Sequence, residues 1–160
     1  MKKKIILLVL ILLIFISCIE KNNRKKDLTN IMNKSLTDKI EEVIEEQKIK
    51  YKYPMKGKRI VTISFDNFSN CLIKISTDFY YDADRIDGYT FFDGYLIVFY
   101  NAHSICSKDM LNINALTIFK DSIAGYKDYS QLNMDYEIIT KTYKIINKDS
   151  LIPIHRTQCR

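Results

Sequence analysis

The sequence predicts an α+β fold in which an N-terminal helix precedes an antiparallel sheet of about six strands. Three observations predict it: one stretch has apolar residues at helical spacing, several stretches alternate apolar and polar residues, and an Asp-Gly pair separates two aromatic-rich segments. The chain has 160 residues, 47% of them hydrophobic and 28% charged, which suits one globular domain. A small all-β sandwich or barrel with an N-terminal helix is the alternative.

The first 18 residues differ from the rest of the chain. Lysines at positions 2–4 precede twelve consecutive apolar residues, Ile5 to Ile16. A membrane-spanning helix needs about 20 apolar residues, so this stretch is too short to span. Its length and its basic flank are typical of a signal peptide.

The residues Ile16-Ser17-Cys18 resemble the end of a bacterial lipobox, in which a small residue precedes an invariant cysteine. The resemblance implies that a diacylglycerol is attached to the Cys18 sulfur, that cleavage follows Ser17, and that the new amino terminus is acylated. It predicts a lipoprotein exported to the outer membrane or to the outer face of the cytoplasmic membrane and anchored there by lipid. An ordinary secretory signal, or an uncleaved short anchor, is the alternative.

The charge of the chain depends on whether this signal is removed. The full chain has 25 basic and 19 acidic side chains, a net charge of +6. Three of the lysines and none of the acids lie in residues 1–17, so the remaining chain carries +3. Such a balanced chain, without a basic stripe, does not favour nucleic acid as a partner. The four glycines are also too far apart for a Gly-rich phosphate loop: Gly57, Gly88, Gly94 and Gly125.

The segments after the signal peptide predict a tether and then a helix. Residues 18–34 are polar and rich in Lys and Asn, as expected for a lipidated tether, and residues 35–160 are expected to form a single domain. A helix is predicted over 36–49, where apolar residues recur at helical spacing: Leu36, Ile40, Val43 and Ile44. Ser35, with Asp38 three residues later, approximates a capping box at its start.

Two strands are expected next in the chain. Val61, Ile63 and Phe65 alternate with polar residues and predict the first strand. A second alternating run extends from Cys71 to Tyr81 after a turn-like segment. Two adjacent runs of this kind indicate an antiparallel pair.

A hairpin is predicted over residues 88–100. Asp93-Gly94 is a preferred dipeptide for a type I′ turn, because both central residues of that turn need positive φ. In that register Phe92 faces Tyr95. Both faces of the hairpin are apolar, so we expect it in the middle of the sheet with something covering each side.

The later segments carry weaker signals. Residues 112–119 and 136–146 are expected to form strands, and 121–135 a loop. Residues 151–154 predict an edge strand, because Pro153 cannot donate a hydrogen bond to a neighbouring strand.

Aromatic residues are concentrated in one part of the chain, with nine of them between Phe79 and Tyr100. Aromatic side chains on strands pack against neighbouring strands, which is the interpretation favoured here. They also form binding faces for sugars or proteins. If such a face exists, the candidates for it are Tyr80, Tyr95 and Tyr100.

Histidine and cysteine side chains suggest two further possibilities. His103 and Cys106 form one closely spaced pair and His155 and Cys159 form another, a weak candidate for a Cys₂His₂ metal site. In an oxidising compartment, a disulfide between Cys106 and Cys159 is the simpler interpretation. Cys71 is predicted to be a buried thiol on the apolar face of a strand.

The sequence contains no G-x-S-x-G or H-E-x-x-H motif. We therefore expect no catalytic residues and no cofactor, but a non-enzymatic binding or scaffold module with a protein or another envelope component as its partner. One alternative is an inhibitor or immunity-type lipoprotein that neutralises an exported toxin or enzyme. Another is a metal-dependent or thiol enzyme that uses the two His–Cys pairs.

Overall fold

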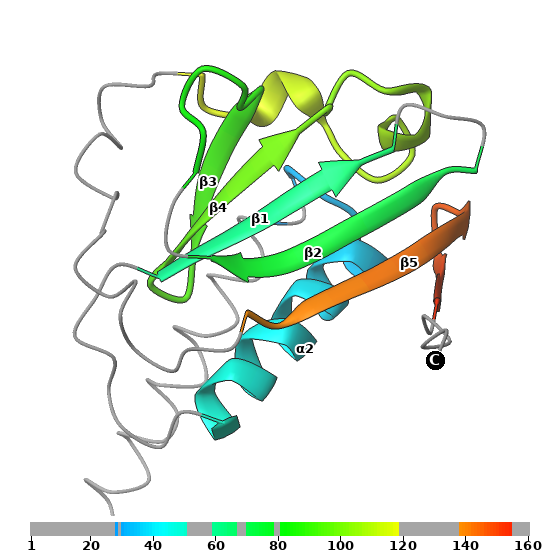
Figure 1. Cartoon of the computed structure of the whole chain (residues 1–160). Helices are drawn as coiled ribbons and strands as arrows, with labels where there is room; N and C mark the ends of the chain where they lie inside the picture. Colours follow the sequence, from blue (N-terminus) through cyan, green and yellow to red (C-terminus); the bar gives the residue numbers. More distant parts are fainter. Residues whose placement is uncertain are drawn as a thin grey trace, which may run out of the picture.

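The computed structural model describes residues 28, 30–50, 59–66, 70–78, 81–118 and 138–154. In these residues one α-helix packs on a six-stranded sheet (Figure 1). The chain order is α2 (Lys34–Lys50), β1 (Arg59–Phe65), β2 (Leu72–Asp78), β3 (Gly88–Phe92), β4 (Tyr95–Tyr100), the 3₁₀ turns η1 (Ile105–Ser107) and η2 (Ile113–Ala115), β5 (Thr140–Asn147) and β6 (Ser150–Pro153). No described helix has the length and apolar character that crossing a membrane requires.

The sheet is mixed rather than antiparallel. The strand order is β3-β4-β1-β2-β5-β6, and four of the five neighbouring pairs are antiparallel, including the predicted pair of β1 and β2. The fifth pair is parallel: Ile60 of β1 lies opposite Leu96 of β4, and Thr62 opposite Val98. The fully antiparallel prediction is wrong for this pair. The chain between β1 and β4 includes β2 and β3, which gives it the length that a parallel pairing requires.

Helix α2 begins earlier than predicted because its cap is Asn33, not Ser35. The side-chain Oδ1 of Asn33 accepts a hydrogen bond from the Leu36 amide at 2.9 Å, and its carbonyl accepts one from the Thr37 amide at 3.1 Å. Ser35 therefore lies inside the first turn of the helix. The four apolar positions of the predicted helix are all buried: Leu36, Ile40, Val43 and Ile44.

The two faces of the sheet have separate apolar clusters. Helix α2 lies against one face of the sheet (Figure 1). The larger cluster lies between α2 and the sheet and includes alternate residues of three strands, among them Ile63, Ile75 and Ile97. Leu28 and Met32 belong to it, each 2% exposed, although both precede residue 35, where the domain was expected to begin. A smaller cluster on the opposite face gathers side chains of β1, β3 and β4 with two from the turn after β2: Ile60, Tyr81, Ile86, Tyr89, Leu96 and Val98.

The β3–β4 hairpin confirms the predicted turn and register. Phe92 lies opposite Tyr95, and both turn residues have positive φ, 48° at Asp93 and 79° at Gly94. Its predicted place in the middle of the sheet is wrong, because β3 forms one edge. The hairpin turn is tied to the helix by an ion pair of 2.6 Å between Lys48 Nζ and Asp93 Oδ2.

The opposite edge is β6, the edge strand predicted from Pro153. The Ile154 amide donates to the Thr142 carbonyl at 2.8 Å, so the nitrogen of the preceding proline faces away from β5. The missing N–H of Pro153 therefore removes no bond from the sheet.

The weaker strand predictions have different outcomes. The strand expected over 136–146 is observed as β5, displaced towards the C-terminus. The strand expected over 112–119 is replaced by η2 and by an isolated bridge between Tyr89 and Thr117. The predicted loop 121–135 lies outside the described residues.

Candidate functional site

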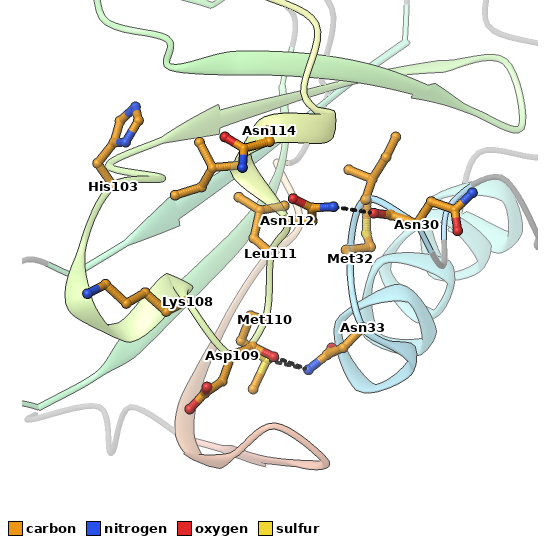
Figure 2. Close-up of a pocket in the computed structure, with 12 residues that line it drawn as sticks. Asn30, Met32, Asn33, His103, Lys108, Asp109, Met110, Leu111, Asn112 and Asn114 are labelled. Carbon is orange, nitrogen blue, oxygen red and sulfur yellow. Dashed lines mark hydrogen bonds between the residues drawn. The ribbon is translucent and has the colours of Figure 1, made fainter.

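A cavity of about 600 Å³ lies where the chain enters the domain (Figure 2). Its walls are residues 30–33 and 108–114, with His103 at one side. The two segments run antiparallel: the Asn33 amide donates to the Met110 carbonyl at 2.9 Å, and the Asn112 amide to the Ile31 carbonyl at 2.7 Å. We call this cavity the amide pocket, because four asparagine side chains line it: Asn30, Asn33, Asn112 and Asn114.

Asn33 holds three segments together at the base of the pocket. While its Oδ1 caps α2, its Nδ2 donates to the Asp109 carbonyl at 3.1 Å and to the Lys148 carbonyl. Nδ2 also lies 3.1 Å from the Met110 sulfur (Figure 2). One amide therefore joins the helix start to the loop after β4 and to the β5–β6 turn, which uses both donors of the amide and one of its acceptor positions.

The other asparagines have hydrogen-bonding capacity to spare. Asn112 Nδ2 donates to the Asn30 carbonyl at 3.2 Å (Figure 2). Within the described residues, the side-chain amides of Asn30 and Asn114 make no hydrogen bond, and both residues are exposed. Each amide offers both donors and an acceptor to a ligand. Apolar side chains of Ile31, Leu111 and Ile113 lie beside them in the lining.

A disulfide fixes the loop that forms one wall of the pocket. Cys106 in η1 is bonded to Cys71, which immediately precedes β2, with the two Cα atoms 5.2 Å apart. This bond replaces the predicted pairing of Cys106 with Cys159, which lies outside the described residues, and it shows that Cys71 is not a free thiol.

The physical reason for this pairing is the parallel arrangement of β1 and β4. Because these strands run in the same direction, their C-terminal ends lie at the same end of the sheet, next to the start of β2. At this end of the sheet the side chain of Asn101, which directly follows β4, donates a hydrogen bond to the Phe65 carbonyl at 3.0 Å. The loop after β4 is thereby brought to Cys71.

The metal candidates are not brought together in the described residues. His103 is exposed on the loop after β4 (Figure 2), and the Cys106 sulfur is used by the disulfide. His155 and Cys159 lie outside the described residues. In the part of the chain that the structure describes, no group of three or more His, Cys, Asp and Glu side chains could hold a metal ion.

The tyrosine candidates do not form an open face. Tyr95 is 1% exposed, because it lies on the side of β4 that packs towards α2. Burial raises its pKa, and the Arg59 guanidinium lies 5.4 Å from the centre of its ring. Tyr100 is half-buried on the other side of β4, where its hydroxyl accepts a hydrogen bond from the Asp82 amide at 3.0 Å. Tyr80 lies outside the described residues.

The sequence does not predict the amide pocket, because its two walls lie about 80 residues apart in the chain, a separation that local patterns do not bridge. The only local signal is the number of asparagines in two short segments, 30–33 and 112–114. Cys18, the predicted lipidation site, lies outside the described residues.

Comparison with known proteins gives no relative. No family model matches the chain, and neither a curated protein nor a solved structure matches it.

Proposed function

We propose that this chain is an exported lipoprotein, anchored through Cys18, whose domain binds a protein or another component of the cell envelope at the amide pocket. The observation that carries the proposal is the position of this pocket. One of its walls, residues 30–33, belongs to the last part of the segment 18–34 that the sequence predicts as the lipidated tether. Its rim offers the side-chain amides of Asn30 and Asn114, which make no hydrogen bond to the residues that the structure describes.

The length of the predicted tether supports a position of the pocket close to the membrane. Leu28, which is buried in the core, lies ten positions after Cys18. Fully extended, ten residues span at most about 35 Å. A lipid on Cys18 would therefore keep the pocket within reach of molecules at the membrane surface.

The disulfide supports the assignment to an exported compartment. Disulfides persist outside the cytoplasm and are rare inside it, where thiols are kept reduced. The bond between Cys71 and Cys106 supports one wall of the proposed binding site. In an oxidising compartment this disulfide would persist and keep that wall in place.

The chemistry of the pocket favours binding over catalysis. Asparagine amides are uncharged and form hydrogen bonds in both directions, so they recognise polar uncharged groups such as the main chain of a partner protein. Binding sites of this kind combine apolar area with a few polar groups that fix orientation. The apolar side chains of Ile31, Leu111 and Ile113 supply that area.

The inhibitor or immunity-type lipoprotein is a narrower form of the same proposal, in which the partner is an exported toxin or enzyme. The metal-dependent or thiol enzyme is not favoured by a specific observation, because Cys106 is committed to the disulfide.

The anchor is tested by the variant Cys18→Ser, with the protein followed in membrane and soluble fractions. We expect the wild-type protein in the membrane fraction and the variant outside it. A variant that stays in the membrane fraction with the same mass as the wild type would show that Cys18 carries no lipid.

The pocket is tested by photo-crosslinking in intact cells. A photoreactive residue is placed at Asn114 in the full-length protein, and at Asp84, an exposed residue that does not line the pocket, as the matched control. We expect a crosslinked product at Asn114 that is absent at Asp84. The same products at both positions, or none at Asn114, would contradict binding at this pocket; an exported enzyme or toxin in the product would identify the inhibitor form.

A further inference from the structure

Two exposed isoleucines lie close to the disulfide at one end of the domain. Ile105, in η1, is 76% exposed, and Ile146, near the end of β5, is 50% exposed. Ile105 directly precedes Cys106, which is bonded to Cys71. Ile145, the neighbour of Ile146, donates its amide to the Cys71 carbonyl at 2.9 Å. The disulfide thus brings the two exposed side chains to one end of the domain, and we call Ile105 and Ile146 the apolar tip.

The apolar tip lies at the end of the domain that the predicted tether enters. Figure 1 shows the loop after β4, the start of β2 and the turn after β5 at the same end of the sheet. Asn33 joins this end to the start of α2, because its Nδ2 donates to the carbonyls of Asp109 and Lys148. The carbonyl of Leu28, the first residue that the structure describes, accepts a hydrogen bond from the Met32 amide at 2.8 Å. The entry of the chain and the apolar tip therefore share one end of the domain.

The charged side chains at this end offset each other. Three lysines and three aspartates lie in the loop after β4, directly after β1, and in the second half of β5 and its turn: Lys108, Asp109, Asp66, Lys144, Lys148 and Asp149. Lys34 and Asp38, in the first turns of α2, add one charge of each sign. The charge at this end therefore attracts neither a strongly anionic nor a strongly cationic partner, and the exposed apolar area decides what it binds.

The size of the apolar tip favours a lipid surface over a protein partner. Each side of a stable protein–protein interface buries about 800 Å², and two isoleucine side chains supply only a fraction of this area. A lipid surface needs less area, because a lipid on Cys18 would already hold the domain beside it. Leu28 lies ten positions after Cys18, which is at most about 35 Å of extended chain. A weak contact between the apolar tip and the bilayer would thereby gain from the effective concentration that the tether sets.

We propose that the apolar tip inserts into the surface of the membrane that holds the lipid of Cys18. This inference rests on the lipid anchor of the proposed function and adds the orientation of the domain on the membrane. Ile105 and Ile146 enter the headgroup region, where their apolar area is removed from water. The amide pocket, at the same end, is then held beside components of the membrane surface. Because the charges at this end offset each other, insertion does not require anionic lipid.

Paramagnetic relaxation in lipid nanodiscs tests this orientation by NMR. The lipidated protein, purified from membranes, is placed in nanodiscs of phosphatidylcholine, with or without phosphatidylglycerol, that contain a lipid with a gadolinium chelate on its headgroup. We expect the strongest broadening at backbone amides of η1 and of the β5–β6 turn, equally in both lipid compositions. The β3–β4 turn, at the opposite end of the sheet, should be broadened least. Uniform broadening of the domain, or broadening of the tip only with phosphatidylglycerol, would overturn the proposal.

A double variant and a matched control assign the contact to the two isoleucines. Ile105→Ser/Ile146→Ser is expected to lower the ratio of docked to undocked domain by about tenfold, because two partly immersed aliphatic side chains are replaced. Broadening at η1 should then fall towards that of the β3–β4 turn. Ile49→Ser, at a residue that is 75% exposed, removes the same side chain from the C-terminal end of α2 and should change nothing. This end of the helix is distant from the tip, because Lys48 pairs with Asp93 of the β3–β4 turn.

All three substitutions are at exposed residues, and unfolding curves establish that each variant folds. An unchanged pattern in the double variant, or an equal loss of broadening with Ile49→Ser, would overturn the docking of the apolar tip. The anchor is judged separately, from intact mass and from retention of the protein on the nanodiscs in size-exclusion chromatography. A protein that carries no lipid and leaves the nanodiscs would overturn the anchor and the docking together. A lipidated protein that stays on the nanodiscs without broadening specific to this end would overturn the docking alone.

Discussion

Asn33 shows how much one side chain contributes to the structure. It lies within the segment 18–34 that the sequence predicts as the tether, yet it caps α2 and holds the loop after β4 and the β5–β6 turn through the same amide. The two functions use different atoms: Oδ1 accepts from the helix, and Nδ2 donates to the carbonyls. Substitutions can therefore separate them.

Replacing Asn33 by alanine is expected to lower the free energy of unfolding by about 2 kcal/mol, because it removes both the cap and the hydrogen bonds to two carbonyls. Asn33→Asp keeps the capping oxygen but loses the donor, so it should retain the contribution of the cap alone. Urea unfolding measures both. The control Asn114→Ala, at an exposed residue of the same pocket, should change stability by less than about 0.5 kcal/mol. A cost for Asn33→Ala no larger than this control would contradict the role given to Asn33.

Tyr143 predicts a specific dependence of stability on pH. Its pKa is raised to about 12 by burial, first, and by the nearby Glu42 carboxylate. A group whose pKa is higher in the folded state stabilises the fold fully below the pKa of the unfolded state, about 10 for tyrosine, and loses this contribution as pH rises towards 12. Stability should therefore fall between pH 10 and pH 12.

The variant Tyr143→Phe tests this origin. Stability of the variant at neutral pH should equal or exceed that of the wild type, since the change removes a buried hydroxyl that has no hydrogen-bond partner among the described residues. Its loss of stability between pH 10 and pH 12 should be smaller than that of the wild type, as measured by urea unfolding at a series of pH values. An identical alkaline loss in both proteins would assign the effect to other groups.

At the level of single elements, the β3–β4 hairpin was the most predictable part of the fold. Its register depends on a two-residue turn that needs positive φ at both residues, and the Asp-Gly pair in the sequence indicates such a turn. All the residues that set this register are close together in the chain. Its position in the sheet depends on the distant strand β1, and no local pattern contains that information. At the outer edge of β3 the chain has no further strand among the described residues. There Tyr89 forms an isolated bridge with Thr117, and Leu116 lies against Gly88.

The two glycines of this hairpin should respond differently to alanine. At Gly94 a methyl group would meet nothing within 4 Å, so the cost comes from the positive φ alone and should be about 1 kcal/mol. At Gly88 the new Cβ would lie 2.8 Å from Leu116 Cβ, and this overlap should cost about 2 to 3 kcal/mol. Thermal or urea unfolding compares the two variants. A larger cost at Gly94 than at Gly88 would contradict the close packing of Leu116 on β3.

The disulfide could not be predicted from element patterns, for the same physical reason. Cys106 and Cys71 meet because the parallel strands β1 and β4 have their C-terminal ends at the same end of the sheet, whereas a fully antiparallel sheet was expected. Alternation of apolar residues placed Cys71 inside a strand, although it lies just before β2, with a positive φ of 45°.

Peptide mapping without reduction should find Cys71 linked to Cys106. Loss of this bond, which spans 35 residues of sequence, is expected to cost about 4 kcal/mol in the chain-entropy model, so the double variant Cys71→Ser/Cys106→Ser should unfold at lower urea concentration. Cys159→Ser serves as the control and should leave stability unchanged. A peptide that links Cys106 to Cys159 would contradict the observed pairing.

At the scale of the whole molecule, the sequence predicted the α-helix, the edge strand and most of the other strands, because apolar periodicity is a local property of the chain. It did not predict the amide pocket, which joins residues 30–33 to residues 108–114. This pocket forms only when the order of the strands brings the two segments together.

The central claim, that this is an exported lipoprotein with a disulfide-supported domain, is tested most directly by one intact-mass measurement. The protein is purified from membranes without reductant and with its thiols blocked. We predict a chain that begins at Cys18, is heavier by the diacylglycerol and the amino-terminal acyl group, and lacks two hydrogens because Cys71 and Cys106 are joined. A chain that still begins at Met1, carries no lipid and has all four cysteines blocked as free thiols would contradict the claim.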